Sequence, residues 1–304
     1  MIEVRNLSKS FGDVKAVTSV SCAIGRGEIF GVVGPDGAGK STLLRMLSTI
    51  LRGDGGSISV GGEDAAAPGS RIKERIAYMP QRFGLYEDLT VEENIHFFGR
   101  LFAVPRKTIG KEITRLYEFS RLGPFRDRLA GNLSGGMKQK LGLACCLVHK
   151  PEVLLLDEPT NGVDPVSRRE FWKILYDLLS GGVTIVVSTA YLDEAERCNR
   201  IAFMYSGRFI TSGSPREIKA GIGRKFLELR ADNAMLAEIE LRRRDEYRGV
   251  ILTGTTLKLF VDNIAAAGRD IRRILAHSGL RVLSLAERQP TLEDCFVHMV
   301  AGES

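Results

Sequence analysis

A glycine-rich segment that ends in a lysine and two hydroxyl residues carries the clearest chemistry in this sequence. The segment reads Gly34-Pro35-Asp36-Gly37-Ala38-Gly39-Lys40-Ser41-Thr42 and matches the phosphate-binding loop pattern. Its glycines allow backbone N–H groups to point at phosphate oxygens. Lys40 would place a positive charge beside the β- and γ-phosphates, and Ser41 would give an oxygen to Mg²⁺.

Two flanking elements must hold this loop in place. The apolar run 28–33 predicts a strand, and the spacing of apolar residues over 43–51 predicts a helix that stops at Gly53. Strand, glycine loop and helix follow one another in the order that a phosphate site requires. The dipole at the helix N-terminus would add to the attraction for an anion.

A second apolar run, 153–156, ends in the acids Asp157 and Glu158. Alone, it could be an ordinary buried strand that emerges into solvent. With a phosphate loop upstream, the pattern favours a Walker B strand, in which Asp157 holds Mg²⁺, usually through water. Glu158 would then orient and polarise the water that attacks the γ-phosphate.

A third motif lies between these two, just before a predicted helix: Leu133-Ser134-Gly135-Gly136-Met137. In this position it resembles the signature of ABC ATPases, which normally reads Leu-Ser-Gly-Gly-Gln. Residues 1–215 carry the motifs in that family's order. The sequence looks most similar to the ATP-binding subunits of bacterial multidrug and antibiotic exporters.

The resemblance implies roles that the residues alone do not fix. In the family, the signature of one subunit caps the γ-phosphate held by the other, so Ser134, Gly135 and Gly136 would act in trans. Met137 replaces the usual Gln and has no side-chain donor, but the backbone does most of the binding there. The implied catalytic residues are Glu158, Gln81 and Lys40, and the implied Mg²⁺ ligands are Ser41, Gln81 and Asp157.

Three positions to which the resemblance assigns a role, Gln81, Phe11 and Asp164, also have a purely structural explanation. Gln81, in the position of the family's Q-loop, could be a surface residue after Pro80. Phe11, where the family places the aromatic that stacks on adenine, could be a core residue. Asp164, in the position of the D-loop that crosses the subunit interface, is also suited to cap the helix predicted from Pro165; these two roles are compatible.

One position departs from the family. The strand predicted over 183–188 is followed by Ser-Thr-His in the family, and that histidine contacts the γ-phosphate. This chain reads Ser188-Thr189-Ala190, and its four histidines (His96, His149, His277, His298) lie elsewhere in the sequence. Two readings follow: hydrolysis through Glu158 without the histidine, which we favour, or a subunit that uses nucleotide mainly to drive closure.

The fold class expected from these patterns is α/β, a P-loop NTPase of ABC type. We expect a RecA-like core, an N-terminal antiparallel β layer and a helical subdomain at about 82–133, all within residues 1–215. Near-continuous apolar strands between helices indicate a parallel sheet that is buried on both faces. Residues 216–304 read strand, helix, hairpin, helix, strand and predict a small C-terminal α/β domain.

Composition limits the other possibilities. The net charge is +6, but Lys and Arg are spread along the chain and the run 242–244 suits a solvated helix face, so we expect no nucleic-acid partner. The five cysteines form no C-x-x-C pair, which fits buried thiols in a cytosolic protein. No run approaches the ~20 apolar residues that span a bilayer. We therefore expect a cytoplasmic protein, peripheral on the inner face of the cell membrane.

The implied partners are an integral membrane permease subunit and a second nucleotide-binding subunit, either identical or a related cassette, with ATP and Mg²⁺ bound. The expected function is ATP-driven export, by family likeness of a drug or another amphiphilic compound. One alternative is a catalytically weak, nucleotide-sensing subunit paired with a competent ATPase. Another, disfavoured by the single set of motifs, is a soluble ABC protein of translation or DNA repair.

Overall fold

A computed structural model describes residues 1–301 of the chain. Its contacts divide the chain into two compact units, Met1–Ser212 and Gly213–Ser304. The boundary expected from the sequence was after residue 215. The last three residues of the predicted C-terminal domain, 302–304, lie outside the described residues.

The first unit begins with an antiparallel sheet in the strand order β2-β1-β4-β5. The strands are β1 (Ile2–Phe11), β2 (Val14–Ile24), β4 (Gly55–Val60) and β5 (Glu63–Asp64). The hairpin between β1 and β2 pairs Phe11 with Val14 across a two-residue turn. Gly12 occupies the left-handed region in that turn, with φ of 56°, as tight hairpins require.

A second sheet has the order β10-β9-β3-β8-β7-β6. Its strands are β3 (Ile29–Val33), β6 (Ile76–Met79), β7 (Val153–Asp157), β8 (Thr184–Thr189), β9 (Arg200–Tyr205) and β10 (Arg208–Gly213). Neighbours from β9 to β6 run parallel. Every residue of β3, β7 and β8 is buried, which explains the uninterrupted apolar runs in the sequence.

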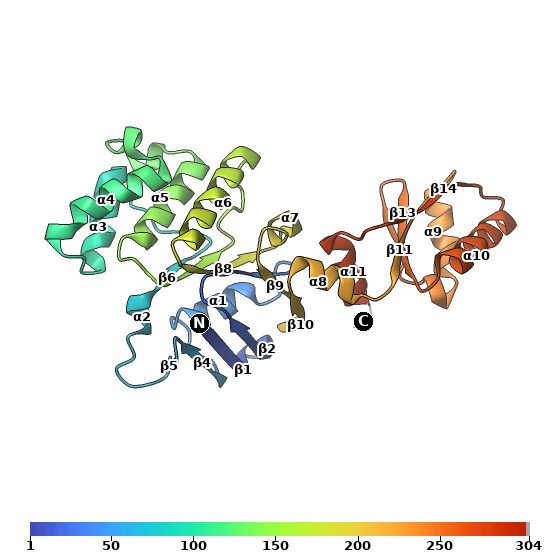
Figure 1. Ribbon diagram of the computed structural model, residues 1–304, viewed down its shortest axis with the longest axis horizontal. Coiled ribbons are helices and arrows are strands. Elements are labelled where there is room, and N and C mark those ends of the chain that lie inside the picture. The colour runs from blue at the N-terminus through green and yellow to red at the C-terminus, as the bar shows by residue number, and fades with distance from the viewer. Residues whose placement is uncertain (302–304) are drawn as a thin grey trace. The chain divides into compact units, whose positions relative to one another are not determined.

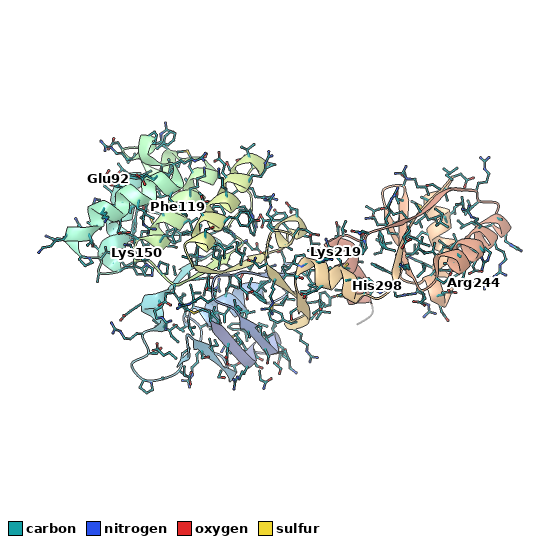
Figure 2. All side chains as sticks on the ribbon, in the orientation of Figure 1. Glu92, Phe119, Lys150, Lys219, Arg244 and His298 are labelled. Atoms are coloured by element: carbon teal, nitrogen blue, oxygen red, sulfur yellow. The ribbon has the colours of Figure 1, made fainter. Side chains whose placement is uncertain are left out.

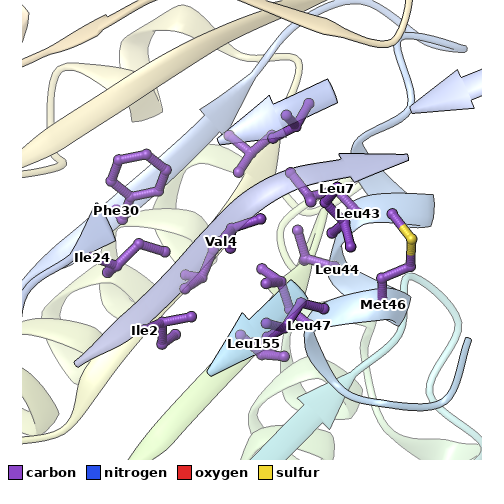
Figure 3. Packing of buried hydrophobic residues seen from close by; sticks show 14 of the residues in the cluster. Ile2, Val4, Leu7, Ile24, Phe30, Leu43, Leu44, Met46, Leu47 and Leu155 are labelled. Atoms are coloured by element: carbon purple, nitrogen blue, oxygen red, sulfur yellow. The ribbon is translucent and has the colours of Figure 1, made fainter. Parts of the chain in front are cut away.

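The main core of this unit lies where β1, β3 and α1 (Lys40–Leu47) meet (Figure 3). β1 contributes alternate residues, Ile2 and Val4, as expected for a strand with one buried face. Leu43, Leu44 and Leu47 come from one side of α1. Each such side chain contributes about 1.5–3 kcal/mol when fully buried, so this packing fixes α1, and with it the loop before it, onto the sheet.

Helices between β6 and β7 form a separate group within the first unit, as Figure 1 shows. These are α3 (Val91–Leu101), α4 (Arg106–Ser120) and α5 (Gly135–Leu147), with the short 3₁₀ turns η1 (Gly123–Phe125) and η2 (Ala130–Asn132). Thr90 and Glu93 form a capping box at the start of α3, which satisfies helix N–H groups that lack a partner. Glu92, Phe119 and Lys150 mark this region in Figure 2.

The remaining helices of the unit are α2 (Ile72–Arg75), α6 (Pro165–Ser180) and α7 (Leu192–Ala195).

The second unit is a four-stranded antiparallel sheet in the order β12-β13-β11-β14. Its elements in chain order are α8 (Pro215–Gly221), β11 (Lys225–Ala231), α9 (Ala234–Arg242), η3 (Asp245–Tyr247), β12 (Ile251–Thr253), β13 (Thr256–Val261), α10 (Ile264–His277), β14 (Val282–Arg288) and α11 (Leu292–Ala301). From β11 to β14 this is the βαββαβ order that the sequence pattern predicts. A core of its own, with Leu229, Leu241 and Ile271 fully buried, holds α9 and α10 on the sheet.

Two further expectations concern cysteines and membrane crossing. Cys145, Cys146 and Cys198 are buried, and burial raises the pKa of Cys198 to about 12, so these positions suit inert thiols. Among the helices within residues 1–301, none combines the length and apolar character that crossing a bilayer demands.

Candidate functional site

Four neighbouring strands end at one edge of the parallel sheet, and the motif residues follow these ends. β3 leads into the glycine loop, β7 ends at Asp157, β8 ends at Thr189, and Gln81 follows β6. The register aligns them, because Asp157 pairs with Ser188 and Val33 with Thr189. In open α/β sheets, ligands bind beyond the carboxyl ends of the strands, so this edge is where a ligand is expected.

The glycine loop wraps tightly against its surroundings. Gly39, directly before α1, has φ of 105°, and a Cβ atom there would lie 2.2 Å from the Ala16 carbonyl oxygen. Only glycine can occupy this position. At Gly39 the loop therefore exposes its backbone to the pocket, because no side chain covers it.

Lys40 is almost fully buried, with 3% of its side chain exposed. Its ammonium donates hydrogen bonds to the carbonyl oxygens of Gly34 (2.8 Å) and Pro35 (2.9 Å). Nζ also lies 3.1 Å from Oε1 of Glu158 and 4.0 Å from Oδ1 of Asp36. A buried ammonium of this kind needs an anionic partner, and Glu158 is the nearer of the two that the structure provides.

Asp157 is buried and accepts three hydrogen bonds from hydroxyl groups. Oδ1 accepts from Ser41 (2.9 Å) and Ser188 (2.7 Å), and Oδ2 accepts from Tyr78 (3.2 Å). Burial, and then the charge of Asp157, raises the pKa of Tyr78 to about 12, so this phenol remains a donor at neutral pH. Ser41 and Asp157, predicted to share one Mg²⁺, thus lie in direct contact.

Glu158 has an unusual backbone for its residue type. Its φ is 47°, in the left-handed region, and its N–H donates to the hydroxyl (3.0 Å) and carbonyl (3.2 Å) oxygens of Ser188. Strain of this kind persists where the surroundings impose it and is typical of functional sites. The turn directs the Glu158 side chain toward Lys40 and Gln81.

Gln81 donates from Nε2 to Oε2 of Glu158 at 3.0 Å. The family resemblance predicts Gln81 as a ligand of Mg²⁺, and the structure brings Gln81 to the same carboxylate that Lys40 contacts. Asn161 donates from Nδ2 to the same oxygen at 3.2 Å. Asn161 was not among the residues predicted from the sequence; its place three residues after Glu158 in the loop that follows β7 was the available signal.

The segment after β8 lies beside this carboxylate. Ala190 is exposed and, with Asp36, Glu158, Asn161 and Tyr191 among its neighbours, lines a pocket of about 240 Å³. Its methyl group offers no hydrogen bond. The lining residues of this pocket, within residues 1–301, include no histidine.

A larger pocket of about 610 Å³ opens over the glycine loop. Asp36, Gly37, Gly39, Lys40, Ser41, Thr42, Gln81 and Glu158 line it, together with residues 14–16 of the β1–β2 hairpin and Ser206 and Gly207. Phe11 belongs to the same hairpin and is 51% exposed, but it is not among the lining residues. Its stacking on a nucleobase stays a prediction.

The Ser134–Met137 motif starts α5, away from this pocket's lining residues. Ser134 is the N-cap and accepts a hydrogen bond from the Met137 N–H at 3.3 Å. A Cβ on Gly136 would lie 2.6 Å from the Ser167 side chain on α6, whereas one on Gly135 would meet nothing within 4 Å. Gly136 is thus required by helix packing, and Gly135 is open to solvent.

Asp164 caps α6, as the sequence suggested. Oδ1 accepts from the N–H groups of Val166 (3.0 Å) and Ser167 (2.9 Å). Hydrogen bonding by Ser167 holds the pKa of Asp164 below its usual range, so the cap is charged at neutral pH.

A parallel sheet that carries a glycine loop, a buried lysine and two adjacent acids at its carboxyl edge defines a P-loop nucleotide-binding protein. Comparison with known families narrows this class. A family model described as "ABC transporter" matches residues 17–161. A second, described as "ATP-binding protein DrrA1-3-like, C-terminal domain", matches residues 213–300.

Individual relatives extend the match over the whole chain. The chain is 42% identical to the "Probable multidrug ABC transporter ATP-binding protein YbhF" of Escherichia coli (strain K12), over 99% of this chain and 52% of that protein. It therefore spans about half the length of that relative. It is 38% identical to the "Nod factor export ATP-binding protein I" of Rhizobium sp. (strain N33), over 99% of this chain and 97% of that protein.

Solved structures agree with the architecture. The structure of cbiO1 from Clostridium perfringens, titled as part of the ABC transporter complex cbiONQ, matches with a TM-score of 0.66 and 29% identity, over 72% of this chain and 90% of that one. The chain belongs to the family of ABC transporter ATP-binding proteins. The predicted fold class, a P-loop NTPase of ABC type, is confirmed.

Proposed function

We propose that this chain is the ATP-binding and ATP-hydrolysing subunit of a bacterial ABC exporter. The observation that carries the proposal is one pocket in which Lys40 contacts Glu158 at 3.1 Å while Ser41 contacts Asp157 at 2.9 Å. Phosphate-binding and water-activating groups are then adjacent, as phosphoryl transfer to water requires.

The glycine loop and Lys40 would hold the triphosphate. Backbone N–H groups and the start of α1 favour an anion, and the Lys40 ammonium can exchange its contact with Glu158 for phosphate oxygens. The fit for Mg²⁺ rests on the oxygens of Ser41, Asp157 and Gln81, because this ion prefers oxygen ligands and keeps few protein contacts. When bound, Mg²⁺ would neutralise charge on the phosphates.

Glu158 would orient and polarise the attacking water. Its carboxylate is 12% exposed and lines both pockets at the sheet edge. Once Lys40 turns to phosphate, one carboxylate oxygen is released to accept a proton from water. The left-handed backbone at Glu158 supports this role, since it directs the side chain into the pocket.

The signature residues would complete the site from a second subunit. Ser134 and Gly135 are exposed at the start of α5 and line neither pocket at the sheet edge, so within one chain they have no part in it. The open N-terminal turn of α5 suits an anion brought by a partner. Asp164 is the N-cap of α6, whose Ser167 lies beside Gly136 of α5, and it would cross the same interface.

The names of the relatives support export through a separate membrane permease. Their printed names describe multidrug and Nod factor export ATP-binding proteins, which supports export of an amphiphilic compound. The compound would be selected by the membrane subunit. Association with that subunit would place this chain on the cytoplasmic face of the membrane.

A second candidate function, nucleotide sensing without efficient hydrolysis, is favoured by one observation, the alanine at position 190. It predicts tight ATP binding and negligible turnover. Lys40, Ser41, Asp157 and Glu158 argue for hydrolysis, because a pure sensor would not need a base beside the phosphate loop.

Steady-state turnover of MgATP by the purified full chain tests the proposal. Glu158→Gln should lower kcat by about 10²- to 10⁴-fold and leave ATP affinity nearly unchanged. Glu118→Gln, the same substitution at an exposed position of α4, should change neither value. Binding of ATP without turnover in the wild type would support the sensing subunit instead.

A further inference from the structure

We infer that Asn161, held in place by Tyr191, is a positioning residue that fixes the Glu158 carboxylate for attack of water. This inference rests on the proposed ATP hydrolysis. Asn161 is the first residue of the D-loop segment 161–164, and the resemblance to the family gave it no role of its own. The loops after β7 and β8 would then position the Glu158 carboxylate without an imidazole at position 190.

The hydrogen bonds around Asn161 run in one direction. Tyr191 donates its hydroxyl to Oδ1 of Asn161 at 3.3 Å, and Asn161 donates from Nδ2 to Oε2 of Glu158 at 3.2 Å. A carboxylate can only accept, so the NH₂ group of Asn161 must face Glu158. The carbonyl oxygen must then face away, where Tyr191 supplies the matching donor. The chain of donors determines the orientation of the amide.

Tyr191 is itself anchored on both its ring and its backbone. The guanidinium carbon of Arg168 lies 4.3 Å from the centre of the Tyr191 ring, an arrangement that favours a cation over an aromatic face. The Tyr191 N–H donates to Oγ1 of Thr189 at 2.9 Å. The hydroxyl is therefore presented to Asn161 from a fixed position.

A buried glutamate ties the two loops together. Glu194, 1% exposed, accepts from Oγ1 of Thr189 at 2.8 Å and from the hydroxyl of Thr160, and lies 3.6 Å from Nε of Arg168. Thr160 directly precedes Asn161, and Thr189 precedes the Ala190–Tyr191 segment. The Glu194 carboxylate, which does not line the pocket, thus fixes the positions of Asn161 and Tyr191 relative to each other.

Asn161 is the contact of Glu158 that nucleotide binding leaves in place. Lys40, on Oε1, is required by the phosphates, and Gln81, on Oε2, is proposed for the metal region. When these two side chains turn to the nucleotide, the amide of Asn161 still holds Oε2. Displacement of a catalytic group by about 1 Å lowers rates by about 10²-fold, so this single contact has a large effect on turnover.

The test compares Tyr191→Phe, Asn161→Ala and the double variant in the full chain. Tyr191→Phe removes one oxygen atom and keeps the ring on Arg168. Tyr176→Phe is the matched control, because that hydroxyl donates to the carbonyl of Arg197 on the surface of the same unit. Steady-state kcat and KM for MgATP, the Kd of a fluorescent ATP analogue without metal, and the thermal midpoint are measured for each protein.

Asn161→Ala should lower kcat by about 10- to 100-fold and Tyr191→Phe by about 3- to 10-fold, with KM, Kd and the thermal midpoint close to wild type. Because Tyr191 acts through Asn161, the double variant should be no slower than Asn161→Ala alone.

Three results would overturn the inference. One is unchanged kcat in both single variants while Glu158→Gln is inactive. Another is an additive loss in the double variant, which would mean that Tyr191 acts independently of Asn161. The third is a loss that appears only in KM or in the thermal midpoint, as a structural role predicts. An inactive wild type would instead reject the proposed hydrolysis, and the inference with it.

Discussion

Residues 1–212 and residues 213–301 are both sheets covered by helices, but they differ in where their charged side chains lie. In the first unit Lys40, Asp157 and Glu194 are buried near the carboxyl edge of the parallel sheet, and Glu112 is buried on α4, where it pairs with Arg115 and Lys150. Among residues 213–301, Asp294 is the only buried charged side chain. Its carboxylate accepts from the N–H (2.9 Å) and hydroxyl (2.8 Å) of Thr291, just before α11, and pairs with Lys258 at 2.9 Å. Burial of a charge is unfavourable unless it is paired, and three of the four buried charges among residues 1–212 gather at the sheet edge where the proposed chemistry takes place.

Each unit is specified by a different kind of sequence signal. The first is marked by residue types at fixed spacing, and the second by the periodicity of its apolar residues. Their failures under mutation should therefore differ: one unit should lose activity and the other stability.

The largest effect on stability is expected for a core truncation in the second unit. Leu229 is fully buried in β11, whereas Leu236 on α9 is 50% exposed. Leu229→Ala should lower the free energy of unfolding by about 2–5 kcal/mol, and Leu236→Ala should change it by less than about 0.5 kcal/mol. Peptide-resolved hydrogen exchange should locate the loss in residues 213–301, with ATP affinity unchanged. A weaker ATP affinity in Leu229→Ala would contradict the prediction that the second unit affects stability but not nucleotide binding.

The converse change is Lys40→Met, which keeps the volume of the side chain and removes its charge. Turnover should fall by about 10²- to 10³-fold, since a preorganised charge on the phosphates is lost. Hydrogen exchange in the second unit should not change. Isothermal titration with ATP measures the binding part of this loss, and wild-type affinity would contradict the placement of Lys40 on the phosphates.

The sequence predicts the fold of both units well where local and long-range signals agree. The strands β3, β7 and β8 and the helices α3, α6 and α10 follow from apolar runs and caps. The short strands β5 and β6, and β4 with its Gly55-Gly56 start, were not predicted, because their pairing partners rather than their own residues stabilise them. α8, with a capping box at Ser214 and Glu217, was missed although its signal was present.

The candidate site was predictable only in part. The loop residues, Asp157 and Glu158 could be named because their spacing is fixed by one strand or one turn. The contacts of Asn161, Tyr191 and Glu194 form between the loops after β7 and β8. These loops are neighbours in the sheet but far apart in the sequence, so the local sequence does not predict the contacts. The packing of Gly136 on Ser167 is of the same kind, since it joins α5 to α6.

The two signature glycines should separate stability from function within the first unit. Gly136→Ala should cost about 1–3 kcal/mol through overpacking against α6. Gly135→Ala has open space and should leave stability nearly unchanged while it lowers turnover at a second subunit's phosphate. Urea unfolding and ATPase assays on both variants measure this. Equal stability losses would contradict the packing argument.

The smallest effect concerns acid sensitivity. Burial lowers the pKa of His149, whose ring stacks on Phe102 at 4.1 Å. Its folded pKa lies below the unfolded value, so the stability it provides is present above that value and is lost as pH falls toward the folded pKa. Between about pH 7.5 and 5.5, His149→Gln should reduce the loss of stability seen in urea titrations. His277→Gln, at an exposed position of α10, should leave that loss unchanged.

We propose above that the site at the sheet edge hydrolyses ATP without a histidine at position 190. The most direct measurement is the MgATP turnover of the wild type, Glu158→Gln and Ala190→His, made side by side on the full chain. We expect turnover by the wild type, its loss in Glu158→Gln, and a change of less than about 10-fold in the turnover of Ala190→His. A wild type as inactive as Glu158→Gln, with activity restored by Ala190→His, would contradict it.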